Sequence, residues 1–82
     1  MKIYDMDGQR NISGERIYRM RTRKHITQAE LAARVQTTGV ILEQDAISRI
    51  ERGLRMVQDY ELRALALVLG VSADWLMQED EK

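Results

Sequence analysis

Apolar residues recur at three- and four-residue spacing along five stretches of this 82-residue chain, with polar or charged residues between them. This is the period of an amphipathic helix whose apolar side faces a core. In chain order, the expected core residues are Ile17 and Met20; Leu31, Ala32 and Val35; Ile47 and Ile50; Leu62, Leu65, Ala66 and Leu69; and Trp75 and Leu76. No stretch alternates as a β-strand does. The pattern predicts an all-α fold of five helices.

Residue types that start and stop helices bound these stretches. The expected N-caps are Ser13, Thr27, Asp59 and Ser72, and the expected stop residues are Gly53 and Gly70. Thr27 and Glu30 have the spacing of a capping box, in which each side chain accepts a hydrogen bond from the other residue's amide. The first helix is predicted to run to about His25, the third from about Glu43 to Arg52, and the fifth from Ala73 to about Met77.

A chain of this length forms one domain with a small core. We expect an N-terminal arm over residues 1–12, a helical domain over 13–78 and an acidic tail over 79–82. The apolar residues of the arm, Ile3, Tyr4 and Met6, can form a mobile segment, pack on a neighbouring subunit or lie against the helical core.

The composition is that of an ordinary globular protein, with 44% hydrophobic and 32% charged residues. No apolar stretch approaches the roughly 20 residues that cross a bilayer, so no membrane association is expected. The chain has no cysteine and therefore neither a disulfide nor a thiolate metal site. This composition fits a reducing compartment, and we expect a cytoplasmic protein.

Residue types that enzymes use are scarce. The chain has one histidine, no cysteine and no glycine-rich phosphate loop. A four-coordinate metal site cannot be assembled from these residues. We therefore expect no enzyme activity, no catalytic residue, no cofactor, no metal and no small-molecule ligand.

The net charge is zero, but the charge is unevenly distributed. Residues 14–55 carry nine basic and five acidic side chains, whereas residues 56–82 carry two basic and six acidic ones. Because phosphate attraction depends on the local face, a neutral total does not exclude nucleic acid. The positive segment contains Thr27–Ala32 and Ile47–Gly53, two short helical pieces that form the skeleton of a helix-turn-helix.

Four motifs occur in a characteristic order: Met20-Arg21, Thr27–Ala32, Ile47–Gly53 and Gly70–Leu76. With them, the segment 16–77 resembles the Cro/phage-repressor, or xenobiotic-response-element, type of helix-turn-helix regulator. The resemblance covers about three quarters of the chain. It implies a lambda-repressor-like DNA-binding domain whose third helix is the recognition helix.

The resemblance also implies roles for individual residues. Gln44, Asp45 and Arg49 occupy outward positions that face base edges; glutamine suits adenine, arginine suits guanine, and aspartate can accept from cytosine. The implied phosphate contacts are Thr27, Gln28, Ser48, Arg52 and Arg55. Arg21 and Glu51 are implied to form a structural ion pair between helices.

Two features depart from the family pattern. The segment 36–42 is longer than in the shortest members by about five residues, which affects where the recognition helix starts and how it docks. Glu43 and Asp45 place two carboxylates near the expected reading edge, where they repel phosphate. Negative charge at a helix N-terminus is stabilising, by about 0.3–1 kcal/mol.

Two functions follow as hypotheses. The first is a sequence-specific DNA-binding transcriptional regulator, expected to be a repressor that binds a palindromic operator in double-stranded DNA as a homodimer. Met56, Val57 and Met77 are its candidate dimer surface. The second is an antitoxin or other protein-interaction module on the same scaffold, motivated by the acidic residues at 43 and 45 and by the apolar arm.

Overall fold

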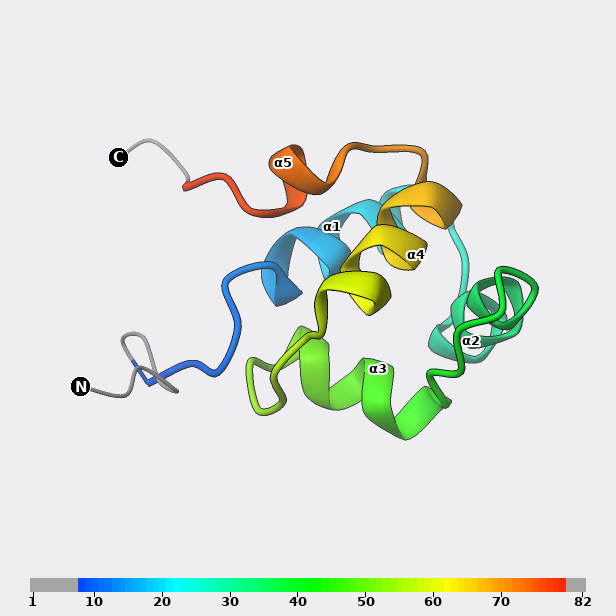
Figure 1. Ribbon diagram of the computed structural model, residues 1–82, viewed down its shortest axis with the longest axis horizontal. Coiled ribbons are helices and arrows are strands. Elements are labelled where there is room, and N and C mark those ends of the chain that lie inside the picture. Colours follow the sequence, from blue (N-terminus) through cyan, green and yellow to red (C-terminus); the bar gives the residue numbers. More distant parts are fainter. Residues whose placement is uncertain (1–7, 80–82) are drawn as a thin grey trace.

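A computed structural model describes residues 8–79, and within that range the chain forms five helices and no strand. The helices are α1 (Gly14–Arg23), α2 (Gln28–Gln36), α3 (Gln44–Glu51), α4 (Asp59–Leu69) and α5 (Ala73–Leu76). In Figure 1, α1 and α4 lie side by side in the middle, with α5 on one side and α3 on the other. α2 packs against α3 and α4. The all-α, five-helix prediction is confirmed.

The core forms where the inner faces of the helices meet. The largest fully buried side chains are Ile17, Leu31, Val35, Ile47, Ile50, Leu65, Leu69 and Leu76. The other expected core residues are either buried or packed against this cluster. The helical period therefore identified the core correctly, because a helix can bury only one side when it lies on a small globule.

Several predicted helix ends are confirmed. Thr27 Oγ1 accepts from the Glu30 amide at 3.0 Å, and Glu30 Oε1 accepts from the Thr27 amide at 2.8 Å. The Thr27 backbone amide and, to a smaller extent, the Thr27 side chain hold the pKa of the Glu30 carboxyl below its usual value. Ser72 Oγ accepts from the Trp75 amide at 2.9 Å. Gly53 and Gly70 follow α3 and α4 with φ of 75° and 73°, which a glycine adopts without a Cβ penalty.

Ser13 is the N-cap residue of α1, as predicted, but it does not cap the helix through its side chain, and the predicted cap Asp59 is wrong. The Ser13 side chain makes no capping hydrogen bond; Asn11 Oδ1 instead accepts from the Gly14 amide at 2.7 Å. Asp59 is the first residue of α4 rather than its cap. Gln58 precedes it, and its amide donates to Glu61 Oε1 at 2.9 Å.

The first helix is also shorter than expected. It ends at Arg23, and His25 takes the left-handed conformation with φ of 58°. The His25 amide donates to the Thr22 carbonyl at 3.0 Å, and the Ile26 amide donates to the Arg21 carbonyl at 3.3 Å. These are the two bonds of a Schellman stop, here built on a histidine rather than a glycine.

The longer segment between α2 and α3 is a turn followed by an irregular stretch that is anchored in the core. The turn ends at Gly39 (φ 94°), and the chain then runs without regular structure to Glu43. Leu42 is only 2% exposed and joins the core, whereas Ile41 is 71% exposed. The extra residues therefore form a loop that rejoins the core at Leu42, and α3 begins at Gln44, within one residue of the predicted start.

Three arrangements were expected for Ile3, Tyr4 and Met6, but these residues lie outside the described range. Most of the acidic tail also lies outside it. The part of the arm that is described contacts the domain, since the Arg10 amide donates to the Gly53 carbonyl at 2.8 Å. Within residues 8–79, no helix combines the length and apolar character needed to cross a membrane.

Candidate nucleic-acid interface

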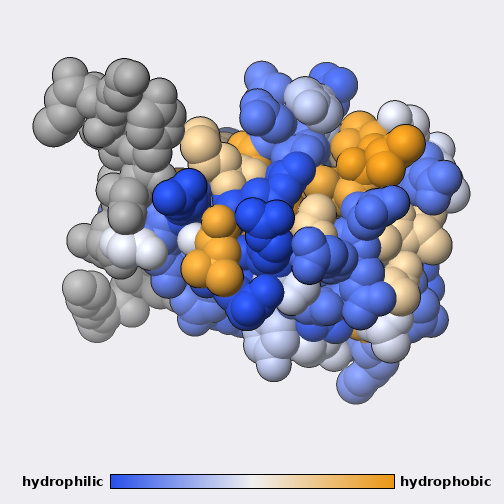
Figure 2. Space-filling view, turned by 90° about the horizontal axis from the view of Figure 1, so that it is seen from below, coloured by the Kyte–Doolittle hydropathy of each residue, from blue (hydrophilic) through white to orange (hydrophobic). Residues whose placement is uncertain are grey.

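The outer face of α3 is polar and accessible. Ile47 and Ile50 fix the inner face of this helix by burial, which turns Gln44, Asp45 and Arg49 outward. Figure 2 shows the molecule from the side on which α3 lies in Figure 1, and the centre of this face is strongly hydrophilic. The structure therefore brings the three residues assigned to base edges together on one exposed surface.

Asp45 and Arg49 stand one helical turn apart on this surface. Arg49 Nη1 lies 4.0 Å from Asp45 Oδ2, and both side chains are largely exposed. An exposed pair at this spacing contributes only about 0.3–0.5 kcal/mol. Arg49 can therefore leave Asp45 for another acceptor at little cost.

A buried carboxylate holds the other end of α3. Arg21 donates to Glu51 through Nε to Oε2 at 2.6 Å and through Nη2 to Oε1 at 3.0 Å. Arg21 Nη1 also donates to the Ile26 carbonyl at 2.9 Å. The hydrogen bond to Glu51 raises the pKa of Arg21 despite its burial. This pair ties α1 to α3.

Gln28 extends this network to α2. Its Nε2 donates to Glu51 Oε1 at 3.0 Å. Gln28 is the first residue of α2, directly after the N-cap Thr27. Its side chain points toward the end of α3. This bond fixes the relative position of the two helices of the helix-turn-helix.

Two further residues assigned to phosphate, Ser48 and Arg52, lie on and just after α3. Ser48 is half-buried and Arg52 is exposed. Arg52 Nε donates to the Ser48 carbonyl at 3.4 Å, a long bond that leaves most of the guanidinium available. With Arg49, Arg52 places a second cation near the end of the exposed face.

Arg55 has an internal partner that the sequence did not reveal. Its Nη1 and Nη2 donate to Glu61 Oε1 at 2.9 Å and Oε2 at 3.1 Å, and Nη1 also donates to the Met56 carbonyl. The Glu61 side chain is 5% exposed and that of Arg55 29%. Burial raises the pKa of Glu61, but the bonds from Arg55 and the Gln58 amide outweigh burial and hold it below its usual value. Arg55 therefore stabilises the turn between α3 and α4, and its contact with phosphate stays a prediction.

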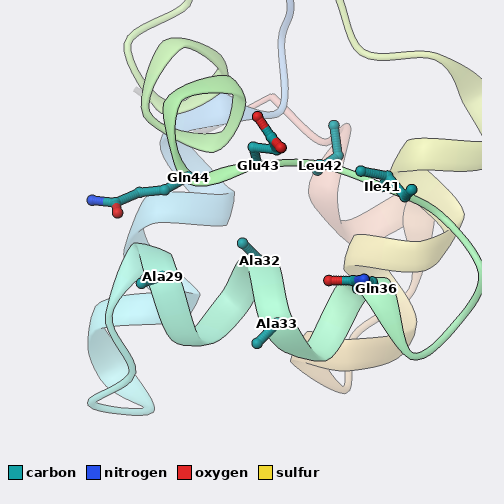
Figure 3. A pocket seen from close by; sticks show the side chains of 8 residues that line it. All are labelled: Ala29, Ala32, Ala33, Gln36, Ile41, Leu42, Glu43 and Gln44. Carbon is teal, nitrogen blue, oxygen red and sulfur yellow. The ribbon is translucent and has the colours of Figure 1, made fainter.

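A surface groove of about 440 Å³ lies between α2 and the start of α3. Its lining is mainly apolar, and Figure 3 shows that α2 forms one wall and the segment 41–44 the other. The lining residues are Ala29, Ala32, Ala33, Gln36, Ile41, Leu42, Glu43 and Gln44. No three of the His, Asp and Glu side chains between residues 8 and 79 are grouped as metal ligands.

Sequence reasoning missed Asn11 and the Arg55–Glu61 pair. The only local signal for Asn11 is its type, since asparagine is a strong helix N-cap, but Ser13 lies nearer the apolar period. The signal for Glu61 was a carboxylate flanked by the apolar residues of α4, beside a basic residue in the preceding turn.

Comparison with known proteins places the chain among helix-turn-helix proteins. A helix-turn-helix family model matches residues 17–76. No curated protein matches the sequence. Among solved structures, the chain is similar to the P22 c2 repressor protein in complex with synthetic operator 9T in the presence of Tl+. The identity is 33%, the match covers 85% of this chain and 98% of that chain, and the TM-score is 0.72.

Proposed function

Because the chain belongs to the Cro/phage-repressor (xenobiotic-response-element) family of helix-turn-helix proteins and is a DNA-binding transcription regulator, we propose that it is a repressor. In this proposal it binds a palindromic operator as a homodimer, with α3 in the major groove. A cytoplasmic location and double-stranded DNA as partner belong to the same proposal.

One observation carries the proposal. α3 presents Gln44, Asp45 and Arg49 on one exposed face, while its opposite face is buried and its end is held by Glu51. A reading helix needs such an arrangement, because base edges are recognised by side chains held in fixed positions. The similar P22 c2 repressor was crystallised in complex with a synthetic operator. This similarity supports operator binding by the present chain.

Each proposed contact has a chemical reason. Arg49 can donate two hydrogen bonds to guanine O6 and N7, Gln44 can pair with adenine, and Asp45 can accept from cytosine N4. We assign phosphate contacts to Thr27 and Gln28 at the start of α2, to Ser48 on α3 and to Arg52 just after α3.

The size of the reading surface supports a homodimer. One recognition helix contacts only a few base pairs, and two copies about 34–36 Å apart reach successive major grooves on one side of DNA. Met56 and Met77 are exposed and Val57 is half-buried against the core. These apolar side chains are the surface we propose for the contact between copies.

The test is selection of bound duplexes from a random DNA pool by the full chain at about physiological salt. A palindromic motif with half-sites one helical turn apart is expected. Recovery of no motif, with weak binding that disappears as salt rises, would contradict the proposal and favour the antitoxin or protein-interaction function.

Arg49→Ala adds residue resolution to this selection. It should relax the preference at one base position by about 1–3 kcal/mol. Arg63→Ala, which removes an exposed arginine from α4, is the matched control and should leave the motif unchanged. Equal weakening on every sequence would make Arg49 a phosphate contact instead.

A further inference from the structure

Asn11 joins three separate parts of the domain through one amide side chain. Its Oδ1 accepts from the Gly14 amide at 2.7 Å, at the start of α1. Its Nδ2 donates to the Ile50 carbonyl at 3.0 Å and to the Arg55 carbonyl at 2.8 Å. These two acceptors lie in the last turn of α3 and in the turn that follows it.

The two bonds from Nδ2 matter because of where α3 ends. The last carbonyls of a helix have no partner within the helix and need donors from outside it. The Gly53 amide supplies one bond to the Ile50 carbonyl, and Asn11 supplies a second. Asn11 is thus a donor from the N-terminal segment that fixes the end of α3 from a distant point of the sequence.

Close backbone packing surrounds this residue. A Cβ at Gly14 would collide with the Ile50 carbonyl oxygen, so α1 starts in direct contact with the last turn of α3. The neighbouring Arg10 amide donates to the Gly53 carbonyl at 2.8 Å. Residues 10 and 11 therefore hold the end of α3 at two successive points.

The start of α3 is held by the burial of Leu42 rather than by a side-chain cap. Its N-cap, Glu43, makes no side-chain capping bond. The position of this eight-residue helix is accordingly determined by core burial and by the bonds at its C-terminal end, to which Arg49 and Arg52 are adjacent. A small displacement of that end moves both cations relative to DNA.

We propose that Asn11 is a positioning residue for DNA reading: it fixes the end of α3 against α1, and so sets the placement of Arg49 and Arg52. This inference rests on the proposed function, because it assigns α3 to the operator. The competing explanation is that Asn11 only caps α1.

Two substitutions separate these explanations. In Asn11→Asp, a carboxylate oxygen still accepts from the Gly14 amide, but the two donors to α3 and its turn are lost. Asn11→Ser also keeps an oxygen that can cap α1 and adds no charge; its one short hydroxyl donor cannot replace both bonds of Nδ2. The control is Ser72→Ala, which removes the cap of α5 and lowers stability without touching α3.

The measurement is the ratio of affinity for the selected operator to affinity for an unrelated duplex, taken at a temperature where every variant is folded. The ratio removes the general repulsion between a new carboxylate and DNA, which weakens both affinities. Loss of these two partly buried hydrogen bonds should lower the ratio by about tenfold or more in both Asn11 variants. The ratio of Ser72→Ala should equal that of the wild type.

A second readout needs no DNA. Amide hydrogen exchange at Gly53 and Leu54, whose amides close the end of α3, should be faster in both Asn11 variants than in Ser72→Ala. Unchanged exchange together with an unchanged ratio in both variants would overturn the inference and leave Asn11 as a cap of α1. If the wild type selects no motif, the proposed function fails and the reading role fails with it. The exchange data then still decide whether Asn11 holds α3.

Discussion

Glu51, the last residue of α3, accepts two hydrogen bonds from Arg21 on α1, at 2.6 and 3.0 Å. Its Oε1 accepts a third, from Gln28 at the start of α2. One carboxylate thus connects three helices, and it is 4% exposed. Such a group is costly to desolvate unless all its acceptor positions are used, so the network acts as a unit.

Glu51→Gln should strongly destabilise the fold. The substitution leaves the buried Arg21 guanidinium without its counter-charge, which costs about 3–5 kcal/mol. Urea denaturation followed by circular dichroism measures this loss. The control is Glu15→Gln, which removes the exposed pair with Arg19 (3.3 Å) and should change stability by less than about 1 kcal/mol. Equal losses of stability in the two variants would show that the Glu51 network contributes no more to the free energy of unfolding than an exposed ion pair does.

Glu61 should make the fold sensitive to acid. Its pKa is lower in the folded chain, where Arg55 and the Gln58 amide stabilise the carboxylate, than the value of about 4.3 expected after unfolding. A lowered folded pKa contributes stability that is present above the unfolded pKa and is lost as pH falls through the folded one.

The free energy of unfolding should therefore decrease as pH is lowered from about 5 toward 3. Glu61→Gln should start less stable near neutral pH, because Arg55 loses its partner, and should lose less on acidification. NMR titration of the Glu61 carboxyl carbon tests the premise directly. A midpoint at or above that of a model peptide would contradict it.

Gly14→Ala should destabilise the protein, although alanine is favoured over glycine within helices by about 1 kcal/mol. The added Cβ would meet the Ile50 carbonyl oxygen and lie 2.9 Å from Asn11 Oδ1. The backbone of α3 cannot yield as a flexible side chain does, so we expect a net loss of about 1–3 kcal/mol. Thr22→Ala, at an exposed position of the same helix, should be neutral or slightly stabilising. A stabilising Gly14→Ala would mean that α1 can move away from α3 at no cost.

The local pattern of the sequence was sufficient for the helices and the core. Ile47 and Ile50 had to face inward for α3 to bury any surface, so the outward position of Arg49 followed from the period alone. The Thr27–Glu30 capping box is likewise contained within four consecutive residues. The ion pair between Arg21 and Glu51 came from the family resemblance, because residues 30 positions apart have no periodic relation.

What the sequence did not reveal depends on contacts between distant segments. Asn11 bonds to carbonyls 39 and 44 residues away, and nothing in its neighbourhood indicates this. The resemblance predicts a phosphate contact for Arg55, and its pairing with Glu61 was missed because the burial of Glu61 becomes evident only when α4 is packed. Ser13 is the N-cap residue of α1, but the side-chain bond at the start of this helix comes from Asn11, and the N-cap of α4 is Gln58 rather than Asp59.

His25→Gly should stabilise the fold. His25 follows α1 with a φ of 58°, a left-handed conformation that costs a residue with a Cβ about 1–2 kcal/mol and a glycine almost nothing. Part of this gain is offset by the greater entropy of glycine in the unfolded chain, so we expect a net increase of about 0.5–1 kcal/mol. The control is Lys24→Gly, one residue earlier, where φ is −85° and glycine should destabilise instead. Thermal unfolding of the two variants measures the difference, and equal melting temperatures would show that the turn after α1 carries no backbone strain.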